Sequence, residues 1–338
     1  MKNFKWFIGI DISKATLDMC LTDGKTVYAE VKATNQEKEI KQRLRQWQKE
    51  FNLKTEEVLL CAEYTGNYIY PLVWGAHSLK LALWLEPGGQ IKQSLGILRG
   101  KDDKIDARRI AGYSYRYQDR VRLFTMNDEH LTELKFLLSE RNGYVTERAK
   151  YIMQIKESTQ FMKPAVQKGR EKRMKEVVSL LSKCIRETEK KMEKILSNQE
   201  VLSKQYDLLL SIPGVGKQTA LETIVATEGF TRFTNARKFI CHAGIAPFTY
   251  TSGTSQRSLA RVSHRANKKL KSLFHLVAIR VIRLKGELSE YYKRKVADGK
   301  AKMLVINAIR SKIILRIFAV IKHNRPYQEN YINNLLLS

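Results

Sequence analysis

Residues 129 to 200 constrain the architecture of this 338-residue chain most strongly. The segment is polar, charged and almost free of glycine, and its apolar residues recur at steps of three and four, the spacing of one helix face. One apolar stripe consists of Leu131, Leu134, Leu138, Val145, Ile152 and Ile155, and a second of Met174, Val177, Leu181, Cys184, Thr188 and Ile195. Pro164 separates the stripes, and proline interrupts helices. The pattern predicts an antiparallel helical hairpin or coiled-coil arm at 127 to 204.

A different pattern precedes the arm. From Phe4 to Lys32 apolar and polar residues alternate around turn residues, which predicts a meander of two or three strands. A helix is expected over 35 to 51, opened by an Asn35 cap and with Ile40, Leu44, Trp47 and Phe51 on one stripe.

Two short apolar runs follow, at 57 to 65 and 81 to 87, with a helix expected between them. Parallel strands of a mixed α/β sheet typically show this order. Residues 1 to 126 are therefore predicted to form an α/β domain, and the glycine-punctuated residues 205 to 338 a mainly helical one.

The charge of the chain indicates its partner. Lysine and arginine number 61 against 34 acidic residues, a formal net charge of +27, so a polyanion is expected. The basic residues are spread along the whole length, without a lipidation signal or a terminal polybasic tail. These features favour nucleic acid over an anionic membrane.

Membrane insertion and export are not expected. The apolar run 303 to 321 contains Arg310, Lys312 and Arg316, which are costly in a bilayer, so it is interpreted as a core helix. The N-terminus does not have the pattern of a signal peptide. The four cysteines lie far apart without a CxxC pair, which argues against a zinc ribbon or a disulfide scaffold. Reduced thiols in the cytoplasm are expected.

Acidic residues stand at the ends of predicted strands. Asp11 ends the run "WFIGIDIS" and Glu63 stands in "LLCAEYTG", while Asp103 and Asp106 are three residues apart and so share one helix face. Such carboxylates can supply the oxygen ligands that hold magnesium against a phosphodiester. The alternatives are a turn residue at position 11 and a solvated helix start at the aspartates.

The motifs "GIDISK", "AEYTG" and "KDDKIDARRIA" resemble, in order and spacing, those of the DEDD transposases of the insertion-sequence 110 family, which includes the 1111 subgroup and the pilin-gene invertases. The resemblance implies a RuvC-like, ribonuclease-H-fold domain. It also implies that Asp11, Glu63, Asp103 and Asp106 are catalytic ligands of Mg²⁺ or Mn²⁺. Relatives usually carry a non-acidic residue at the position of Asp102, which is excluded, although its adjacency leaves the choice between 102 and 103 open.

Two C-terminal patterns indicate contact with phosphate. The stretch "SIPGVGK" is similar to the turn of a helix-hairpin-helix element, in which Gly214 and Gly216 let backbone amides approach a phosphate and Lys217 adds charge. A loop rich in hydroxyl side chains follows, and then a basic run heads into a helix. The residues of this run expected to bind nucleic acid are Arg257, Arg261, Arg265 and Lys268.

The same family carries an alanine-glycine pair, a proline, a Ser-Gly pair and then a basic stretch before a helix. Here these positions are Ala243, Gly244, Pro247, Ser252, Gly253, Arg257, Ser263 and Asn267. The resemblance implies that Ser252 is the nucleophile, whose Oγ forms a phosphoserine link to DNA. Ala266 stands where a glycine is expected and His264 where a lysine is usual, and the neighbouring hydroxyls of Tyr250, Thr251 and Ser255 stay open as candidates.

The resemblance implies a transposase or site-specific recombinase that excises and inserts its own element and works near the nucleoid of a prokaryote. It implies as partners the DNA of the element ends and target, a structured guide (bridge) RNA, and further copies of the chain in a dimer or tetramer. In that assembly the acids of one subunit act with the serine of another, and the helical arm is the candidate for the contact. The alternatives are a RuvC-type junction-resolving nuclease that uses water, and a non-enzymatic DNA-binding protein.

Overall fold

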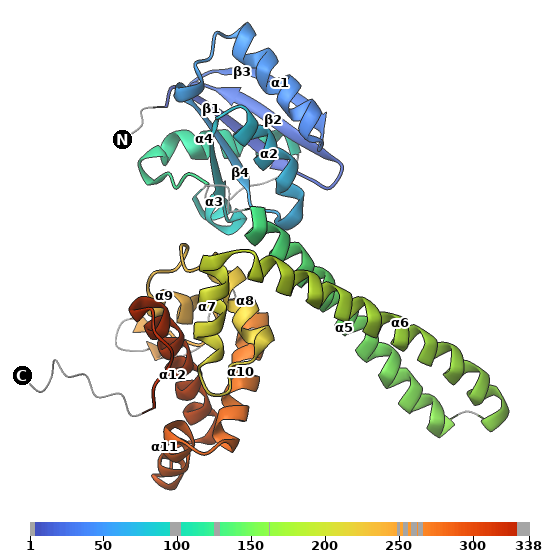
Figure 1. Cartoon of the computed structure of the whole chain (residues 1–338). Helices are drawn as coiled ribbons and strands as arrows, with labels where there is room; N and C mark the ends of the chain where they lie inside the picture. The colour runs from blue at the N-terminus through green and yellow to red at the C-terminus, as the bar shows by residue number, and fades with distance from the viewer. Residues whose placement is uncertain are drawn as a thin grey trace, which may run out of the picture. The chain divides into compact units, whose positions relative to one another are not determined.

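The computed structural model describes residues 4–94, 103–124, 129–161, 163–248, 251–252, 256–257, 262 and 266–329, with the backbone alone at 103–104, 158–160, 165, 251–252 and 256–257. The chain divides into two compact units, Met1–Met126 and Asn127–Ser338 (Figure 1). Each unit has its own hydrophobic core, as the two halves of the sequence pattern require.

The first unit is built on a mixed five-stranded sheet with strand order β3-β2-β1-β4-β5. The first three strands form the predicted antiparallel meander, and β4 and β5 continue the sheet parallel to β1. Both expectations from the alternating and apolar runs are therefore confirmed. The strands are β1 (Trp6–Ile12), β2 (Thr16–Thr22), β3 (Val27–Thr34), β4 (Val58–Glu63) and β5 (Ala82–Glu86).

Helices cover both faces of this sheet (Figure 1). Since side chains alternate along a strand, Ile8, Ile10 and Leu60 face one core, which they share with α1 (Glu37–Glu50) and α2 (Tyr70–Ser78). Phe7 and Leu59 face the other, which they share with α3 (Gly88–Ser94) and α4 (Asp103–Arg116). The odd-numbered residues of β1 and β4 thus point towards α4.

The prediction that Asn35 caps α1 is wrong. Gln36 occupies the N-cap position of α1 and makes no side-chain capping bond. The Asn35 side chain instead donates from Nδ2 to the carbonyl oxygens of Ser13, at 3.0 Å, and Tyr68, at 2.9 Å. These two acceptors are remote in sequence, 22 and 33 residues from Asn35.

The second unit begins with the predicted antiparallel arm, formed by α5 (Glu129–Phe161) and α6 (Pro164–Ser197) (Figure 1). The end of the arm that joins the C-terminal helices contributes Leu134 and Leu138 to their core, whereas Ile152, farther out, is 39% exposed. The predicted apolar stripe is therefore buried on one part of the arm and open on another.

The rest of the unit is mainly helical. The predicted border between arm and C-terminal domain, at residue 205, stays a prediction; that residue lies inside α7 (Glu200–Leu210). The run 303–321 lies within α12 (Lys302–His323), which buries Ile309, Ile313 and Ile317 in the core. Within the described ranges we find no helix that combines the length and the apolar character needed to cross a bilayer. The remaining elements are α8 (Lys217–Thr227), α9 (Ala236–His242), β6 (Thr251–Ser252), β7 (Gln256–Arg257), α10 (Lys268–Arg283) and α11 (Glu287–Ala297).

Candidate active site

Asp11 and Glu63 lie at the same edge of the first unit's sheet. In the parallel pair β1 and β4 the last partners are Ile10 and Ala62, and the two acids are the next residues of their strands. Both side chains are half-buried. Alternation directs both towards the face that α4 covers. Two carboxylates from remote parts of the sequence are thus brought to one carboxyl edge.

Helix α4 brings the predicted aspartate pair to this edge. A Cβ atom on Gly9 would lie 2.2 Å from the carbonyl oxygen of Ala107, so the helix backbone rests directly on β1. The Phe7 ring meets the ring of Tyr115, with 5.4 Å between the centroids. From Phe7 to Gly9, β1 therefore runs towards the N-terminal end of α4. Asp11, two residues further along the strand, lies in the direction of the first turns of this helix.

Asp106 lies in those first turns, half-buried, and accepts a hydrogen bond of 2.8 Å from Nη1 of Arg109. Asp103 is the first residue of α4, and its side chain, like all of Asp102, lies outside the described residues. Among the described side chains, no three histidine, cysteine or acidic groups are close enough together to hold a metal ion. The donor chemistry, carboxylate oxygens from two strands and a helix, nevertheless fits a hard divalent cation.

Sequence reasoning missed a third strand-end acid, Glu86. It is the register partner of Glu63 in the parallel pair β4 and β5. Its Oε2 accepts a 2.8 Å hydrogen bond from Nε1 of Trp84. Burial raises the pKa of the Glu86 carboxyl, and the Trp84 bond and the charge of Arg122 offset part of the rise. The signal was present, because "LALWLEP" ends an apolar run in an acid just as "LLCAEYTG" does.

Gly88, the first residue of α3, packs directly against the carboxylate of Glu63. A Cβ atom on Gly88 would lie 1.7 Å from Oε1 of Glu63 and 2.1 Å from its carboxyl carbon. Only glycine leaves room for the carboxylate in this position. Residues that support the acid therefore come from β5 and α3 as well as from its own strand.

We expect Gly88→Ala to slow the DNA cleavage that the resemblance implies by about 10- to 100-fold, because the methyl group moves the Glu63 carboxylate by about 1 Å or more. The fold should survive, since the side chain of glutamate can rotate away. Single-turnover cleavage measures the rate. Combining Gly88→Ala with Glu63→Gln should then slow the reaction no further than Glu63→Gln alone, and an additive loss would contradict this role for Gly88.

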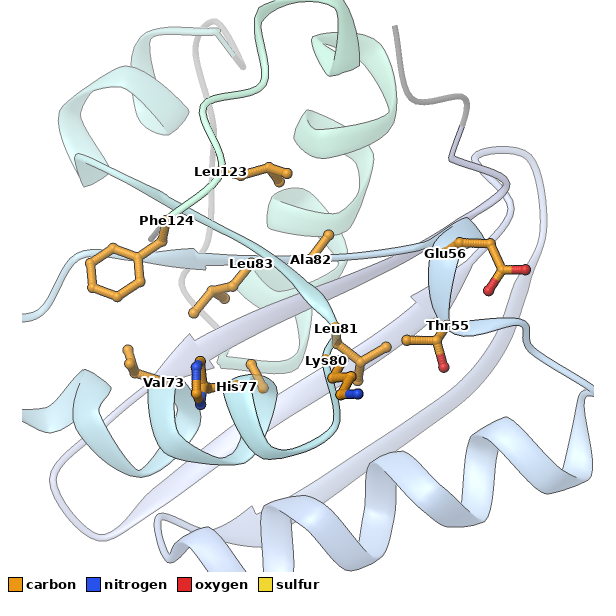
Figure 2. A pocket seen from close by; sticks show the side chains of 11 residues that line it. Thr55, Glu56, Val73, His77, Lys80, Leu81, Ala82, Leu83, Leu123 and Phe124 are labelled. Atoms are coloured by element: carbon orange, nitrogen blue, oxygen red, sulfur yellow. The ribbon is translucent and has the colours of Figure 1, made fainter. Parts of the chain in front are cut away.

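A hollow of about 440 Å³ lies at the opposite edge of this sheet. Figure 2 shows its lining from the C-terminal half of α2, including His77, from Leu81, which precedes β5, and from Leu83 near the start of β5. Leu123 and Phe124 close another side (Figure 2). Because these residues line the amino end of β5, the hollow is separate from the acidic edge.

The predicted hairpin in the second unit connects α7 to α8. Gly214 has a φ of +85°, and a Cβ atom there would lie 2.2 Å from Cγ2 of Val281, so glycine is required on both counts. Gly216 is the N-cap of α8. Nζ of Lys217 lies 2.8 Å from Oε1 of Glu193 in the arm. This lysine thus has an acidic partner, which a phosphate would have to replace.

Ser252 lies on a short antiparallel ladder formed by β6 and β7, opposite Gln256. The backbone of Arg257 lies on β7, opposite Thr251. The side chains of Ser252 and Arg257, and all of Tyr250, Arg261 and Arg265, are outside the described residues. Lys268, the first residue of α10, is exposed.

The two ends of this loop are joined to each other. The backbone N–H of Asn267 donates to the carbonyl oxygen of His242, at 2.8 Å. Gly244, with a φ of +67°, packs so tightly that a Cβ atom would lie 2.6 Å from Cβ of Ala266. The Asn267 side chain caps α10 by accepting from the N–H of Leu270 at 3.1 Å. The glycine and asparagine of the predicted motif therefore hold the base of the loop.

Buried polar groups support the same base from α12. Asn307 donates from Nδ2 to the carbonyl oxygen of Ile245, at 2.8 Å. One turn on, the buried guanidinium of Arg310 donates to Nδ1 of His275, at 2.5 Å. Since a guanidinium only donates, Nδ1 of His275 accepts and the ring is neutral there. Burial and the charge of Arg310 both lower the pKa of His275.

Two family models match the chain. A model described as "Transposase", the DEDD domain of this class, matches residues 8–164, and a model described as "Transposase IS116/IS110/IS902 family" matches residues 206–293. The first match contains the acids of the sheet edge and α4. The second contains the hairpin, Ser252 and the whole basic run.

The chain is also similar to individual proteins. The "Pilin gene-inverting protein" of Moraxella bovis is 27% identical over 330 residues, which cover 96% of this chain and 98% of that protein. The "Insertion element IS110 uncharacterized 43.6 kDa protein" of Streptomyces coelicolor is 30% identical over 121 residues, 36% of this chain and 30% of that protein. A structure of Thermus thermophilus RuvC in complex with a Holliday junction substrate is 14% identical, with a TM-score of 0.27, and the match covers 35% of this chain and 99% of that one.

The architecture agrees with the family matches. A mixed five-stranded sheet with helices on both faces forms the first unit, and the mainly helical second unit carries the transposase match. The expected fold class is thereby confirmed. The chain belongs to the IS116/IS110/IS902 family of transposases, enzymes that cleave and rejoin DNA, and it carries their DEDD domain at its N-terminal end.

Proposed function

We propose that this transposase excises and inserts its own insertion sequence, guided by a structured non-coding RNA, and that it cuts DNA through a phosphoserine intermediate. The observation that supports the proposal is that Asp11 and Glu63 end neighbouring parallel strands at one sheet edge, while α4, whose first turns carry Asp103 and Asp106, packs its backbone on β1. Carboxylates contributed by two strands and a helix are a ligand set that a hard divalent cation would bind.

The proposed role of these acids is to hold Mg²⁺, or Mn²⁺ in its place, with Asp11, Glu63, Asp103 and Asp106 as ligands. A divalent ion at this edge would neutralise charge on a phosphate group. Arg109, which pairs with Asp106, restrains one ligand. Glu86, whose pKa is raised, lies beside Glu63 in the sheet, and in this proposal it does not bind the metal directly.

Ser252 supplies the proposed nucleophile. Its Oγ forms a bond to the phosphorus of one phosphodiester, the bond from phosphorus to the leaving oxygen breaks, and the leaving strand takes a proton to end in a free hydroxyl. The hydroxyl of the new partner strand then attacks the phosphoserine, which rejoins DNA and restores the serine without ATP. The two ends of the loop that carries Ser252 are joined by the bond between Asn267 and His242.

In this proposal the second unit binds the nucleic acid. Gly214, Gly216 and Lys217 approach a phosphate backbone at the hairpin, and the basic run from Arg257 through Arg261 and Arg265 to Lys268 binds beside the serine. A net charge of +27 is consistent with two nucleic-acid partners, DNA and guide RNA. The active form is a dimer or tetramer joined through the arm, and it works on the nucleoid in the cytoplasm.

A covalent-adduct assay tests the proposal. The protein is incubated with guide RNA, labelled element-end DNA and Mg²⁺, denatured, and examined for DNA that stays attached to protein. We expect an adduct that Ser252→Ala abolishes and Tyr250→Phe retains, with the phosphate mapped to Ser252 by mass spectrometry.

Each of the other outcomes favours a different function or a different nucleophile. Cleavage without an adduct supports a junction-resolving nuclease that uses water. Binding without cleavage, in the presence of the guide RNA, supports a non-enzymatic DNA-binding protein. An adduct that survives Ser252→Ala moves the nucleophile to another hydroxyl.

A further inference from the structure

Aromatic rings are exposed close to the acidic edge of the first unit. Among its described residues, the aromatic side chains more than two fifths exposed are Tyr28 (43%), Tyr64 (44%), Tyr68 (45%) and Trp74 (42%). Three of the four fall between residues 64 and 74, directly after Glu63 in the chain. Large rings left in water at one place indicate a surface that binds something.

Tyr64 and Tyr68 are held by backbone bonds at this edge. The N–H of Tyr64 donates to the carbonyl oxygen of Glu86, at 2.9 Å, so its backbone extends β4 by one residue beyond Glu63. The carbonyl oxygen of Tyr68 accepts from Nδ2 of Asn35, which also binds the carbonyl oxygen of Ser13. The rings therefore start from a fixed backbone, which lowers the entropy cost of binding a partner.

Trp74 extends the exposed surface along α2. Its ring lies 5.8 Å, centroid to centroid, from that of Tyr70. Val73 and His77, on another side of the same helix, line the separate hollow at the opposite edge (Figure 2). Since Trp74 is not among the residues that line the hollow, packing there does not account for its position.

A positive charge accompanies the rings. Lys14 is exposed and follows Ser13, whose carbonyl oxygen shares the Asn35 amide with Tyr68. A cation beside exposed rings suits a strand of nucleic acid, in which phosphates alternate with flat bases. Bases within a duplex have both faces covered by neighbours, so only unpaired bases can stack on the rings.

We propose that Tyr64, Tyr68 and Trp74 form a stacking surface for unpaired bases of the DNA strand whose phosphodiester lies at the acidic edge. The inference rests on the proposed function, because it takes DNA as the substrate of that edge. The surface distinguishes single-stranded from duplex DNA without reading sequence, since every base has a flat face.

Photo-cross-linking of the full chain tests the proposal directly. A single-stranded oligodeoxynucleotide carrying 5-iododeoxyuridine is bound in EDTA, irradiated, and the cross-linked peptide identified by mass spectrometry. We expect cross-links within residues 64 to 74. Cross-links confined to the second unit, or obtained equally with the duplex, would overturn the proposal.

Affinity gives a second measurement, by fluorescence anisotropy with the same oligonucleotide. Tyr68→Leu should weaken single-strand binding about fivefold or more, whereas Tyr68→Phe, which keeps the ring, should stay within about twofold. Duplex affinity should not change. A preference for RNA of the same sequence that depends on Tyr68, without the DNA effect, would reject DNA as the occupant.

Tyr28→Leu is the matched control. Tyr28 is equally exposed but meets the Trp6 ring edge-to-face, with 5.0 Å between centroids, at the start of β1 and therefore at the edge opposite the acids. This variant should bind single strands like the wild type, and an equal loss in both variants would defeat the proposal. Binding is measured in EDTA, which stops cleavage, so this test is independent of the adduct assay. The stacking surface can fail here while the Ser252 adduct still forms, and the adduct can fail to form while single strands still bind the rings.

Discussion

Glu63→Gln is expected to slow DNA cleavage by about a hundredfold or more, because the amide keeps the shape of the side chain but loses the charge that would bind a cation. Glu63 is half-buried at the end of β4, and glutamine fills the same space beside Gly88. Folding should therefore be preserved. Single-turnover cleavage of element-end DNA in Mg²⁺ measures the rate, and circular dichroism measures the fold.

The other end of the same strand provides the control. Glu57 immediately precedes β4 and lies 2.6 Å from Nζ of Lys5 in an exposed ion pair, which contributes about 0–1 kcal/mol. Glu57→Gln should leave the cleavage rate unchanged. If Glu63→Gln cleaves as fast as this control, Glu63 is not a ligand and the proposed acidic site is wrong.

Gly9→Ala is expected to lower the free energy of unfolding of the first unit by about 3 kcal/mol, since the methyl group would overlap atoms that are fixed. The added Cβ would lie 2.2 Å from both the carbonyl oxygen of Ala107 and the backbone nitrogen of Ala111. Neither atom can rotate away, so α4 must shift and carry Asp103 and Asp106 with it. Cleavage should fall together with stability.

Tryptophan fluorescence during urea denaturation reports this effect selectively. The four tryptophans of the chain, Trp6, Trp47, Trp74 and Trp84, all lie in the first unit. Gly112→Ala is the control in the same helix, because the nearest atom to its new Cβ is a side-chain nitrogen of Arg116 at 3.9 Å. That variant should be stabilised by up to about 1 kcal/mol. Equal midpoints for both variants would refute the close packing of α4 on β1.

Most of the fold could be predicted because its signals are local. Alternation from Phe4 to Lys32 specifies strands by itself, and the stripes on either side of Pro164 specify two helices that must pack together. The cap of α1 could not be predicted in this way. Asparagine is a favoured residue type at a helix N-cap, but the partners of the Asn35 side chain, Ser13 and Tyr68, are 22 and 33 residues away in the sequence.

A residue of the candidate site could be predicted only where a sequence pattern at that residue marks it. Asp11 and Glu63 end apolar runs, and the resemblance to the transposase family selected them. Gly9 and Gly88 carry no such signal. Their importance comes from what lies opposite, the backbone of α4 and the carboxylate of Glu63, and only the packing of separate elements reveals it. Glu86 needed the register of β5 against β4.

The joined ends of the loop that carries Ser252 also affect how this part of the chain can vary. The bond from Asn267 to His242 closes the loop at its base, independently of the number of residues it contains, and the bond from Asn307 to Ile245 anchors its first end to α12. For a loop closed in this way, doubling the length costs only about 0.6 kcal/mol of closure entropy. Insertions or deletions between the two ends can therefore alter the reach of the nucleophile while α10 and α12 keep their packing.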